Sequence, residues 1–200
     1  MRRGAGDCND FLEVTLYSNQ LQLADREALY SDGDRYLPAV MAAKALKNYL
    51  PEIRQVLALG SGLASIAYVL DSKGCKPHFT LVEKDKVVLN WATELMPAGM
   101  ADRVVPICAD ASVFMEKNTL KFDLIFCDIF IGRVVPDFVL TEAFFTQCKN
   151  AINPGGHIAF NYLINNPADW DNVLQVFASV FPDYKVHKSG LNRVLTSSVK

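Results

Sequence analysis

The stretch Val56-Leu57-Ala58-Leu59-Gly60-Ser61-Gly62-Leu63-Ala64 decides the fold. Four apolar residues lead into two glycines, and an apolar, helix-compatible segment follows as far as Leu70. This order predicts a buried parallel strand, a tight turn and the start of a helix. Gly60 and Gly62 permit a sharp turn and a close approach of the backbone to a ligand. Because a helix N-terminus carries unpaired N–H groups, the stretch predicts a site for a nucleotide-like ligand.

Composition indicates one soluble domain. The chain has 200 residues, of which 50% are hydrophobic, and a net charge of −2. We therefore expect one large core and no general attraction to nucleic acid or to an anionic membrane. No stretch approaches the roughly 20 apolar residues of a membrane span, and the polar N-terminus lacks a signal core. Five cysteines without paired spacing predict free thiols, a cytoplasmic location and no zinc site.

Strands and helices alternate from Gln55 onward. The expected strands are Val56–Leu59, Phe79–Val82, Val104–Cys108, Phe122–Cys127 and His157–Asn161. The expected helices are Leu63–Ser72, Lys86–Leu95, Ala111–Lys117 and Val139–Ala151. Continuous apolar strands that are each followed by a helix predict a parallel sheet covered on both faces.

The last part of the chain completes this sheet. The run Asn153-Pro154-Gly155-Gly156 predicts a turn before the fifth strand. A helix is expected over Pro167–Val180, and two strands over Tyr184–His187 and Arg193–Thr196. The short connection between these two strands predicts a hairpin, so we expect the last strand to be antiparallel.

The N-terminal segment differs in pattern. Met1–Asn9 is expected to be loose, and apolar and polar residues alternate over Leu12–Leu23, which predicts a hairpin. Because an isolated hairpin is marginally stable, it must pack on the main domain or on a second subunit. We interpret Asp25–Asp34 as a loop and expect a helix over Pro38–Tyr49. The chain is thus divided into an N-terminal segment, 1–36, and a Rossmann-like domain, 37–200.

Carboxylates follow three of the predicted strands. Glu83 ends the second strand, Asp110 follows the third and Asp128 follows the fourth. In an open parallel sheet, ligands bind outside the carboxyl ends of the strands, so these side chains and the glycine turn are expected to meet in one crevice. A carboxylate there accepts hydrogen bonds from ribose hydroxyls or amines, or takes a proton from a nucleophile.

Each feature also has a purely structural interpretation. The glycine pair can serve only to turn the chain, and Glu83 or Asp110 can cap a helix or favour its dipole. The charged run Lys84-Asp85-Lys86 is typical of a solvated helix start. Asp128 is harder to explain in this way, because it stands among apolar residues, where a carboxylate is costly unless it faces a polar cleft.

Several motifs together resemble a known family. They are Gly-x-Gly at Gly60, Glu83-Lys84-Asp85, Asp110-Ala111, Phe122–Asp128, Asn153-Pro154-Gly155-Gly156 and the hairpin Leu16–Leu23. In this order they resemble the class I S-adenosylmethionine-dependent methyltransferase fold, and within it the spermidine synthase (aminopropyltransferase) branch. The resemblance implies a doubly wound, mainly parallel, seven-stranded α/β sheet with a small N-terminal β-hairpin. It also implies an adenosyl donor, no metal, and a dimer as a common assembly.

The resemblance assigns roles residue by residue. It implies that Asp128 is the catalytic carboxylate that deprotonates or orients the attacking amine. It implies substrate contacts for Gln22 and Tyr30. The implied cofactor-binding residues are Gly60, Ser61, Gly62, Glu83, Lys84, Asp110 and Ala111, with Glu83 on the ribose and the pair Asp110-Ala111 at the adenine edge.

The sequence also departs from the aminopropyltransferase pattern. Leu63 stands where an aspartate usually follows the glycine motif, Ala64 and Ser65 replace glycines, Ile131 replaces a second aspartate, and Ser31 replaces a histidine. The missing groups bind amines, so the nucleoside half of the site is kept and the polyamine half is altered.

Four functions therefore stay open. The first is a spermidine synthase-like transferase that uses S-adenosylmethionine or decarboxylated S-adenosylmethionine and places a group on an amine such as a polyamine. The second is a small-molecule methyltransferase that releases S-adenosylhomocysteine instead of methylthioadenosine. The third is a catalytically eroded binding protein of the same fold. A nicotinamide-dependent oxidoreductase is a fourth and weaker reading, because the hairpin and the Asn153–Gly156 turn argue against it.

Overall fold

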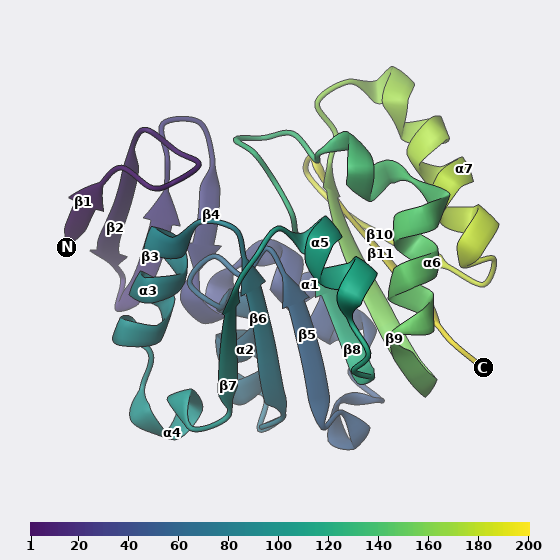
Figure 1. Cartoon of the computed structure of the whole chain (residues 1–200), viewed down its shortest axis with the longest axis horizontal. Coiled ribbons are helices and arrows are strands. Elements are labelled where there is room, and N and C mark those ends of the chain that lie inside the picture. The colour runs from purple at the N-terminus through teal and green to yellow at the C-terminus, as the bar shows by residue number, and fades with distance from the viewer.

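A seven-stranded sheet forms the centre of the protein (Figure 1). The computed structural model describes residues 1–200. The strand order is β10-β11-β9-β8-β5-β6-β7. The strands are β5 (Gln55–Leu59), β6 (His78–Glu83), β7 (Val104–Cys108), β8 (Phe122–Cys127), β9 (Ile152–Leu163), β10 (Lys185–Ser189) and β11 (Asn192–Ser198). The five strands from β7 to β9 are parallel, and β11 lies antiparallel between β9 and β10, which confirms the predicted doubly wound, mainly parallel sheet.

Helices cover both faces of this sheet because its strands are apolar on both sides. Alternate residues of β5 belong to different cores: Val56 and Ala58 to one, Leu57 and Leu59 to the other. The first core holds α1 (Leu37–Ala45), α2 (Ser65–Ser72), part of α3 (Lys86–Leu95) and the short α4 (Ala98–Ala101). The second core holds α5 (Ala111–Lys117), α6 (Glu142–Asn150) and α7 (Trp170–Val180).

The helix expected over Val139–Ala151 is interrupted. A 3-10 turn, Asp137–Leu140, ends at Thr141, and α6 begins only after it. The Thr141 hydroxyl accepts the Phe144 N–H at 3.2 Å, so this residue caps α6 instead of lying inside a longer helix. The expected helix over Pro167–Val180 is likewise a 3-10 turn, Pro167–Asp169, followed by α7. The first helix ends at Ala45, before the expected limit at Tyr49.

Strand β9 begins five residues before the expected strand His157–Asn161. Phe122 pairs with Ile152 and Leu124 pairs with His157, so the predicted turn Asn153–Gly156 is a bulge inside the strand. Asp123 holds this bulge, because its carboxylate accepts the Asn153 side-chain amide at 2.8 Å. The turn prediction was therefore wrong as a strand boundary, although the local backbone does leave the regular ladder.

The N-terminal segment forms its own four-stranded antiparallel sheet (Figure 1). Its strands are β1 (Arg2–Gly4), β2 (Leu12–Tyr17), β3 (Gln20–Ala24) and β4 (Leu29–Asp32). The predicted hairpin β2–β3 is confirmed, and its turn residues Ser18 and Asn19 have φ of 47° and 62°. Two expectations were wrong: β1 lies in the segment expected to be loose, and β4 lies in the expected loop. Both strands are too short and polar to show a period.

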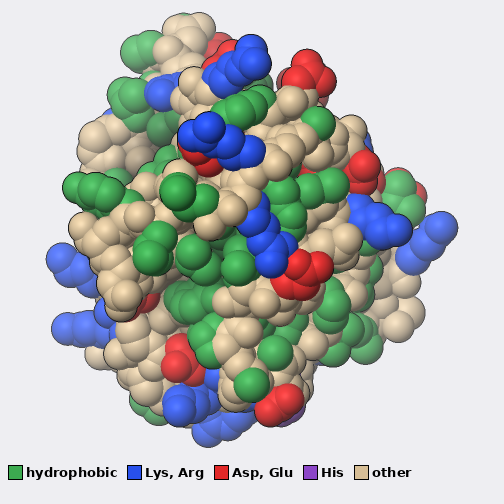
Figure 2. Space-filling view, turned by 90° about the vertical axis from the view of Figure 1, so that its left-hand side faces the viewer, with side chains coloured by type: hydrophobic (Ala, Val, Ile, Leu, Met, Phe, Trp, Pro, Cys, Tyr) green, Lys and Arg blue, Asp and Glu red, His purple; other side chains and the backbone are tan.

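This sheet packs on the main domain through a small apolar cluster. Leu12, Val14 and Leu23 meet Leu63, Val88 and Ala92. Hydrophobic side chains also remain exposed among charged ones on the side of the molecule that holds this sheet (Figure 2). The division at residue 36 and the homodimer stay predictions. Each helix is too short or too polar to cross a membrane, and all five cysteines carry free thiols.

Candidate functional site

The glycine turn after β5 is held by close backbone contacts. Gly60 has a φ of +77°, and its N–H donates to the Val82 carbonyl at 3.0 Å. A Cβ at Gly60 would lie 2.4 Å from the carbonyl oxygen of Asp128. A Cβ at Gly62, which has a φ of +48°, would lie 2.5 Å from the Ser31 hydroxyl oxygen. Glycine is therefore required at both positions, because the turn presses against the end of β8 and against β4.

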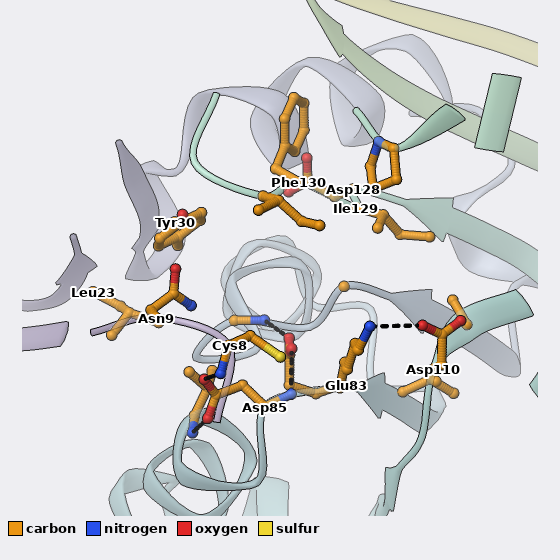
Figure 3. Close-up of a pocket in the computed structure, with 18 of the residues that line it drawn as sticks. Cys8, Asn9, Leu23, Tyr30, Glu83, Asp85, Asp110, Asp128, Ile129 and Phe130 are labelled. Carbon is orange, nitrogen blue, oxygen red and sulfur yellow. Dashed lines mark hydrogen bonds and ion pairs between the residues drawn. The ribbon is translucent and has the colours of Figure 1, made fainter. Parts of the chain in front are cut away.

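A cavity of about 230 Å³ opens at this end of the sheet (Figure 3). It is lined by most of the residues that the sequence singled out: Tyr30, Gly60, Gly62, Glu83, Lys84, Asp110, Ala111 and Asp128. Parallel strand order brings them together, since β5, β6, β7 and β8 are neighbours. The expected convergence of three carboxylates and a glycine turn is thus what the structure contains.

Ser61 and Gln22 do not line this cavity. The buried Ser61 hydroxyl donates to the Gly62 carbonyl at 3.3 Å. The Gln22 side-chain amide donates to the Asp32 carboxylate at 3.1 Å, across the N-terminal sheet. The roles that the resemblance implied for these two side chains stay predictions.

Glu83 braces the glycine turn. One carboxylate oxygen accepts the Gly62 N–H at 3.2 Å, and the other accepts the Asp85 N–H at 3.1 Å. Burial raises the pKa of this carboxyl above its ordinary value, although these backbone hydrogen bonds act against the rise. Each oxygen keeps a further lone pair, so the carboxylate can still accept hydrogen bonds from a ligand.

Asp110 both caps a helix and lines the cavity. It caps α5 by accepting the Ser112 N–H at 2.9 Å, and it also pairs with the Lys84 ammonium at 3.1 Å. Partial burial acts to raise the pKa of Asp110, but the hydrogen bonds from Ser112 and Lys84 outweigh it and lower the pKa. The capping alternative is therefore real, and it does not remove the side chain from the cavity.

Asp128 is a partly buried carboxyl beside few polar partners. Asn161, on β9, donates its side-chain amide to Asp128 at 2.8 Å. Burial raises the pKa of Asp128 to about 6, while the Asn161 and Tyr36 side chains act to lower it and the nearby Glu83 raises it further. A carboxyl with a pKa near 6 holds and releases a proton near neutral pH, as a general base requires.

The Tyr30 hydroxyl already has a hydrogen-bond partner in the protein. It donates to the Asp25 carboxylate at 2.6 Å. Burial is the main cause that raises the pKa of Tyr30 far above its ordinary value, and the hydrogen bond to Asp25 adds to it. Tyr30 therefore offers the cavity a ring and a neutral hydroxyl that does not ionise near neutral pH.

Sequence reasoning missed a segment that reaches the cavity from the N-terminus. We call residues Gly6–Asn9 the N-terminal strap. Cys8 and Asn9 line the cavity, across from Ile129 and Phe130 (Figure 3). No sequence pattern signals this placement, because the strap is polar and without periodicity.

Asp85 holds the strap and was misread as solvated. It is only 2% exposed. One carboxylate oxygen caps α3 by accepting the Val87 N–H at 2.9 Å, and the other accepts the Cys8 N–H at 3.1 Å. An aspartate directly before a predicted helix is a capping signal, so this contact with α3 was available from the sequence.

Known proteins resemble the chain in sequence and structure, although no family model matches it. The polyamine aminopropyltransferase of Vibrio vulnificus is 25% identical over 168 residues, which are 81% of this chain and 56% of that protein. A probable spermidine synthase from Corynebacterium glutamicum superposes with a TM-score of 0.82 at 20% identity, over 98% of this chain and 79% of that one. Human methyltransferase-like protein 13, solved in complex with SAH, superposes with a TM-score of 0.67 at 21% identity, over 84% and 82%.

The strand order and the site define a protein of the class I methyltransferase fold. Within that fold the chain is spermidine synthase-like. It spans about half the length of the curated relatives that it matches.

Proposed function

We propose that the chain is a transferase that moves a group from an adenosyl sulfonium donor, S-adenosylmethionine or its decarboxylated form, to an amine or similar nucleophile. One observation carries the proposal. The partly buried Asp128 carboxyl, with a pKa of about 6, lies in the same cavity as the glycine turn, Glu83 and Asp110. A base and a nucleoside-type site are thus within one cavity.

The donor half of the site fits an adenosyl ligand by its chemistry. Glu83 keeps lone pairs for ribose hydroxyls, and Asp110 lies beyond it at the other end of the cavity (Figure 3). Val82 and Ala109 line the same cavity and provide apolar walls for a base. The similarity to a protein solved with SAH supports the same ligand class. No group of three or more His, Cys, Asp or Glu side chains is placed to hold a metal ion.

Asp128 supplies the proton acceptor for the reaction. The lone pair of the acceptor nitrogen attacks the carbon bonded to sulfur, the carbon–sulfur bond breaks, and its electrons neutralise the sulfonium. The proton lost from nitrogen passes to Asp128. Because a neutral thioether leaves readily, the protein contributes mainly by aligning the two reactants.

Methyl transfer is the second candidate, and Leu63 favours it. This side chain is 4% exposed and packs among apolar residues, at the position where the resemblance expects an amine-binding aspartate. Both donors carry an ammonium that this position does not bind, and in the decarboxylated donor that ammonium is the only charged group at the end of the arm. A donor that retains its carboxylate is less dependent on an aspartate there.

Calorimetric titration of the purified protein tests the proposal. S-Adenosylmethionine, decarboxylated S-adenosylmethionine and methylthioadenosine are titrated separately. Binding of methylthioadenosine supports a nucleoside site, and absence of binding by all three contradicts the proposed function. A higher affinity for S-adenosylmethionine than for its decarboxylated form favours methyl transfer, and the reverse favours aminopropyl transfer.

A further inference from the structure

A second cavity, of about 330 Å³, lies beside the first. Tyr30, Tyr36 and Phe130 line both cavities. Asp128 lines the first, and Asn161, which donates to Asp128 at 2.8 Å, lines the second. The Asp128–Asn161 pair therefore lies at the boundary, where a molecule in the second cavity reaches a donor in the first.

Asn161 has an unused acceptor at this boundary. The residue is 2% exposed, and its Oδ1 atom has no hydrogen-bond partner. The orientation of the amide follows from the chemistry of its neighbour, because only the nitrogen can donate to a carboxylate. A buried acceptor without a partner is unfavourable. An amine N–H of a bound molecule would satisfy it, and the same amine would then lie beside Asp128.

Two oppositely charged side chains without an ion-pair partner, Glu27 and Arg133, line the second cavity. Asp32 and Arg35 pair with each other at 3.0 Å, so they compensate one another. Glu27 and Arg133 also line this cavity, and neither forms an ion pair. Glu27 lies close to the backbone beside Arg133. A Cβ at Gly132 would lie 3.0 Å from a Glu27 carboxylate oxygen, and Arg133 is the next residue in the chain.

We propose that the second cavity binds the acceptor, and that the acceptor is a diamino acid. Its reactive amine donates to Asn161 Oδ1 and lies beside Asp128. Its other end carries an ammonium group for Glu27 and a carboxylate for Arg133, because adjacent opposite charges match a zwitterion. A plain diamine leaves Arg133 without a counter-charge and places a second cation near it. This inference rests on the proposed function and names its substrate class.

Two probes that differ by one carboxylate test the inference. L-Ornithine and 1,4-diaminobutane are titrated into the protein that has been saturated with methylthioadenosine. We expect ornithine to bind at least tenfold more tightly. Arg133→Met should remove this preference, while Lys185→Met, a matched change on the exposed edge of β10, should leave it intact. Glu27→Gln should weaken ornithine binding and leave 4-aminobutanoate binding unchanged.

Equal or tighter binding of 1,4-diaminobutane would overturn the inference. So would a preference for ornithine that survives in Arg133→Met. If S-adenosylmethionine, its decarboxylated form and methylthioadenosine all fail to bind, the proposed function fails, and the two probes are compared on the free protein instead. Failure of both probes to bind to the free protein also overturns the inference. Because Arg133 is exposed, we expect Arg133→Met to fold normally, and a thermal unfolding curve verifies this.

Discussion

Asn161 at the end of β9 donates its side-chain amide to Asp128 at the end of β8, over 2.8 Å. This bond fixes the carboxyl of a neighbouring strand at the boundary between two cavities. Oδ1 of Asp128 is the atom that accepts this bond. The geometry of the proposed base is therefore set by two adjacent parallel strands and not by a flexible loop.

Activity should fall in acid with the titration of Asp128. The pKa is raised to about 6 by burial, so the carboxyl is mainly deprotonated at pH 7 and mainly protonated at pH 5. We expect kcat/KM to decline about tenfold for each pH unit well below 6, because only the deprotonated form accepts a proton. A pH profile with decarboxylated S-adenosylmethionine measures this. A profile that stays level down to pH 4.5 would contradict the role of Asp128.

Asp128→Asn should lose activity and gain stability. In the unfolded chain the carboxyl ionises near its ordinary pKa of 3.8, whereas in the folded protein it ionises near 6. Stability is therefore lost as pH rises from 3.8 to 6, and the loss persists at neutral pH, on the order of 2–3 kcal/mol. The amide avoids this loss, so Tm at pH 7 should rise while activity drops by about 10²–10⁴-fold. Thermal unfolding at pH 7 and at pH 3.5 separates the effects, since the gain should vanish at the lower pH.

Glu83→Gln should weaken donor binding. The amide nitrogen of glutamine cannot accept a backbone N–H, so one of the bonds from Gly62 and Asp85 is lost along with the charge. A lost charge-assisted hydrogen bond costs about 1.5–3 kcal/mol, which is about 10–150-fold in Kd. Titration with methylthioadenosine measures it. Glu116→Gln, the same change on the exposed face of α5, is the control, and equal affinities of the two variants would refute the role of Glu83.

Gly6→Ala should release the N-terminal strap. The added Cβ would lie 2.0 Å from an Asp85 carboxylate oxygen, so the strap must shift away from α3. We expect a loss of about 1–3 kcal/mol in unfolding free energy and weaker donor binding, because Cys8 and Asn9 line the cavity. Gly99→Ala is the control, since a Cβ there meets nothing within 4 Å. Donor affinity that is unchanged in Gly6→Ala would show that the strap does not shape the site.

Gly60→Ala separates steric clash from backbone strain. At Gly60 the new Cβ would lie 2.4 Å from the Asp128 carbonyl, and φ is +77°. At Gly190, φ is +54° but nothing lies within 4 Å. Gly190→Ala should therefore cost about 1–2 kcal/mol of unfolding free energy, and Gly60→Ala about 2–5 kcal/mol with loss of donor binding. Chemical denaturation measures the unfolding free energy of both variants. Similar losses would mean that the Asp128 backbone moves aside at little cost, which would contradict the steric role of Gly60.

The sequence predicted the elements whose signals are local. Strands β7 and β8 and helices α3 and α5 have the expected limits, because each strand is a short apolar or β-branched run and each of these helices follows a capping aspartate. Strands β1 and β4 were missed because they are short, and their pairing partners are defined only in three dimensions. The β9 bulge was read as a turn because the glycines of Asn153–Gly156 do leave the ladder there.

The candidate site likewise contains residues that the sequence predicted and residues that it did not. Glu83, Asp110 and Asp128 were found because parallel strands bring their carboxyl ends to one edge of the sheet. Tyr36 and the strap residues Cys8 and Asn9 reach the cavity from outside that strand pattern. Asn161 was seen only as the end of a strand, and its role depends on a partner 33 residues earlier in the chain.

The two cavities that share Tyr30, Tyr36 and Phe130 have a kinetic consequence. In the proposed arrangement each ligand binds in a cavity of its own, so neither must depart before the other arrives. Catalysis in such an arrangement proceeds through a ternary complex by single displacement, without a modified form of the protein between two half-reactions. Double-reciprocal plots at varied concentrations of both ligands should then intersect, whereas parallel lines would indicate a ping-pong scheme.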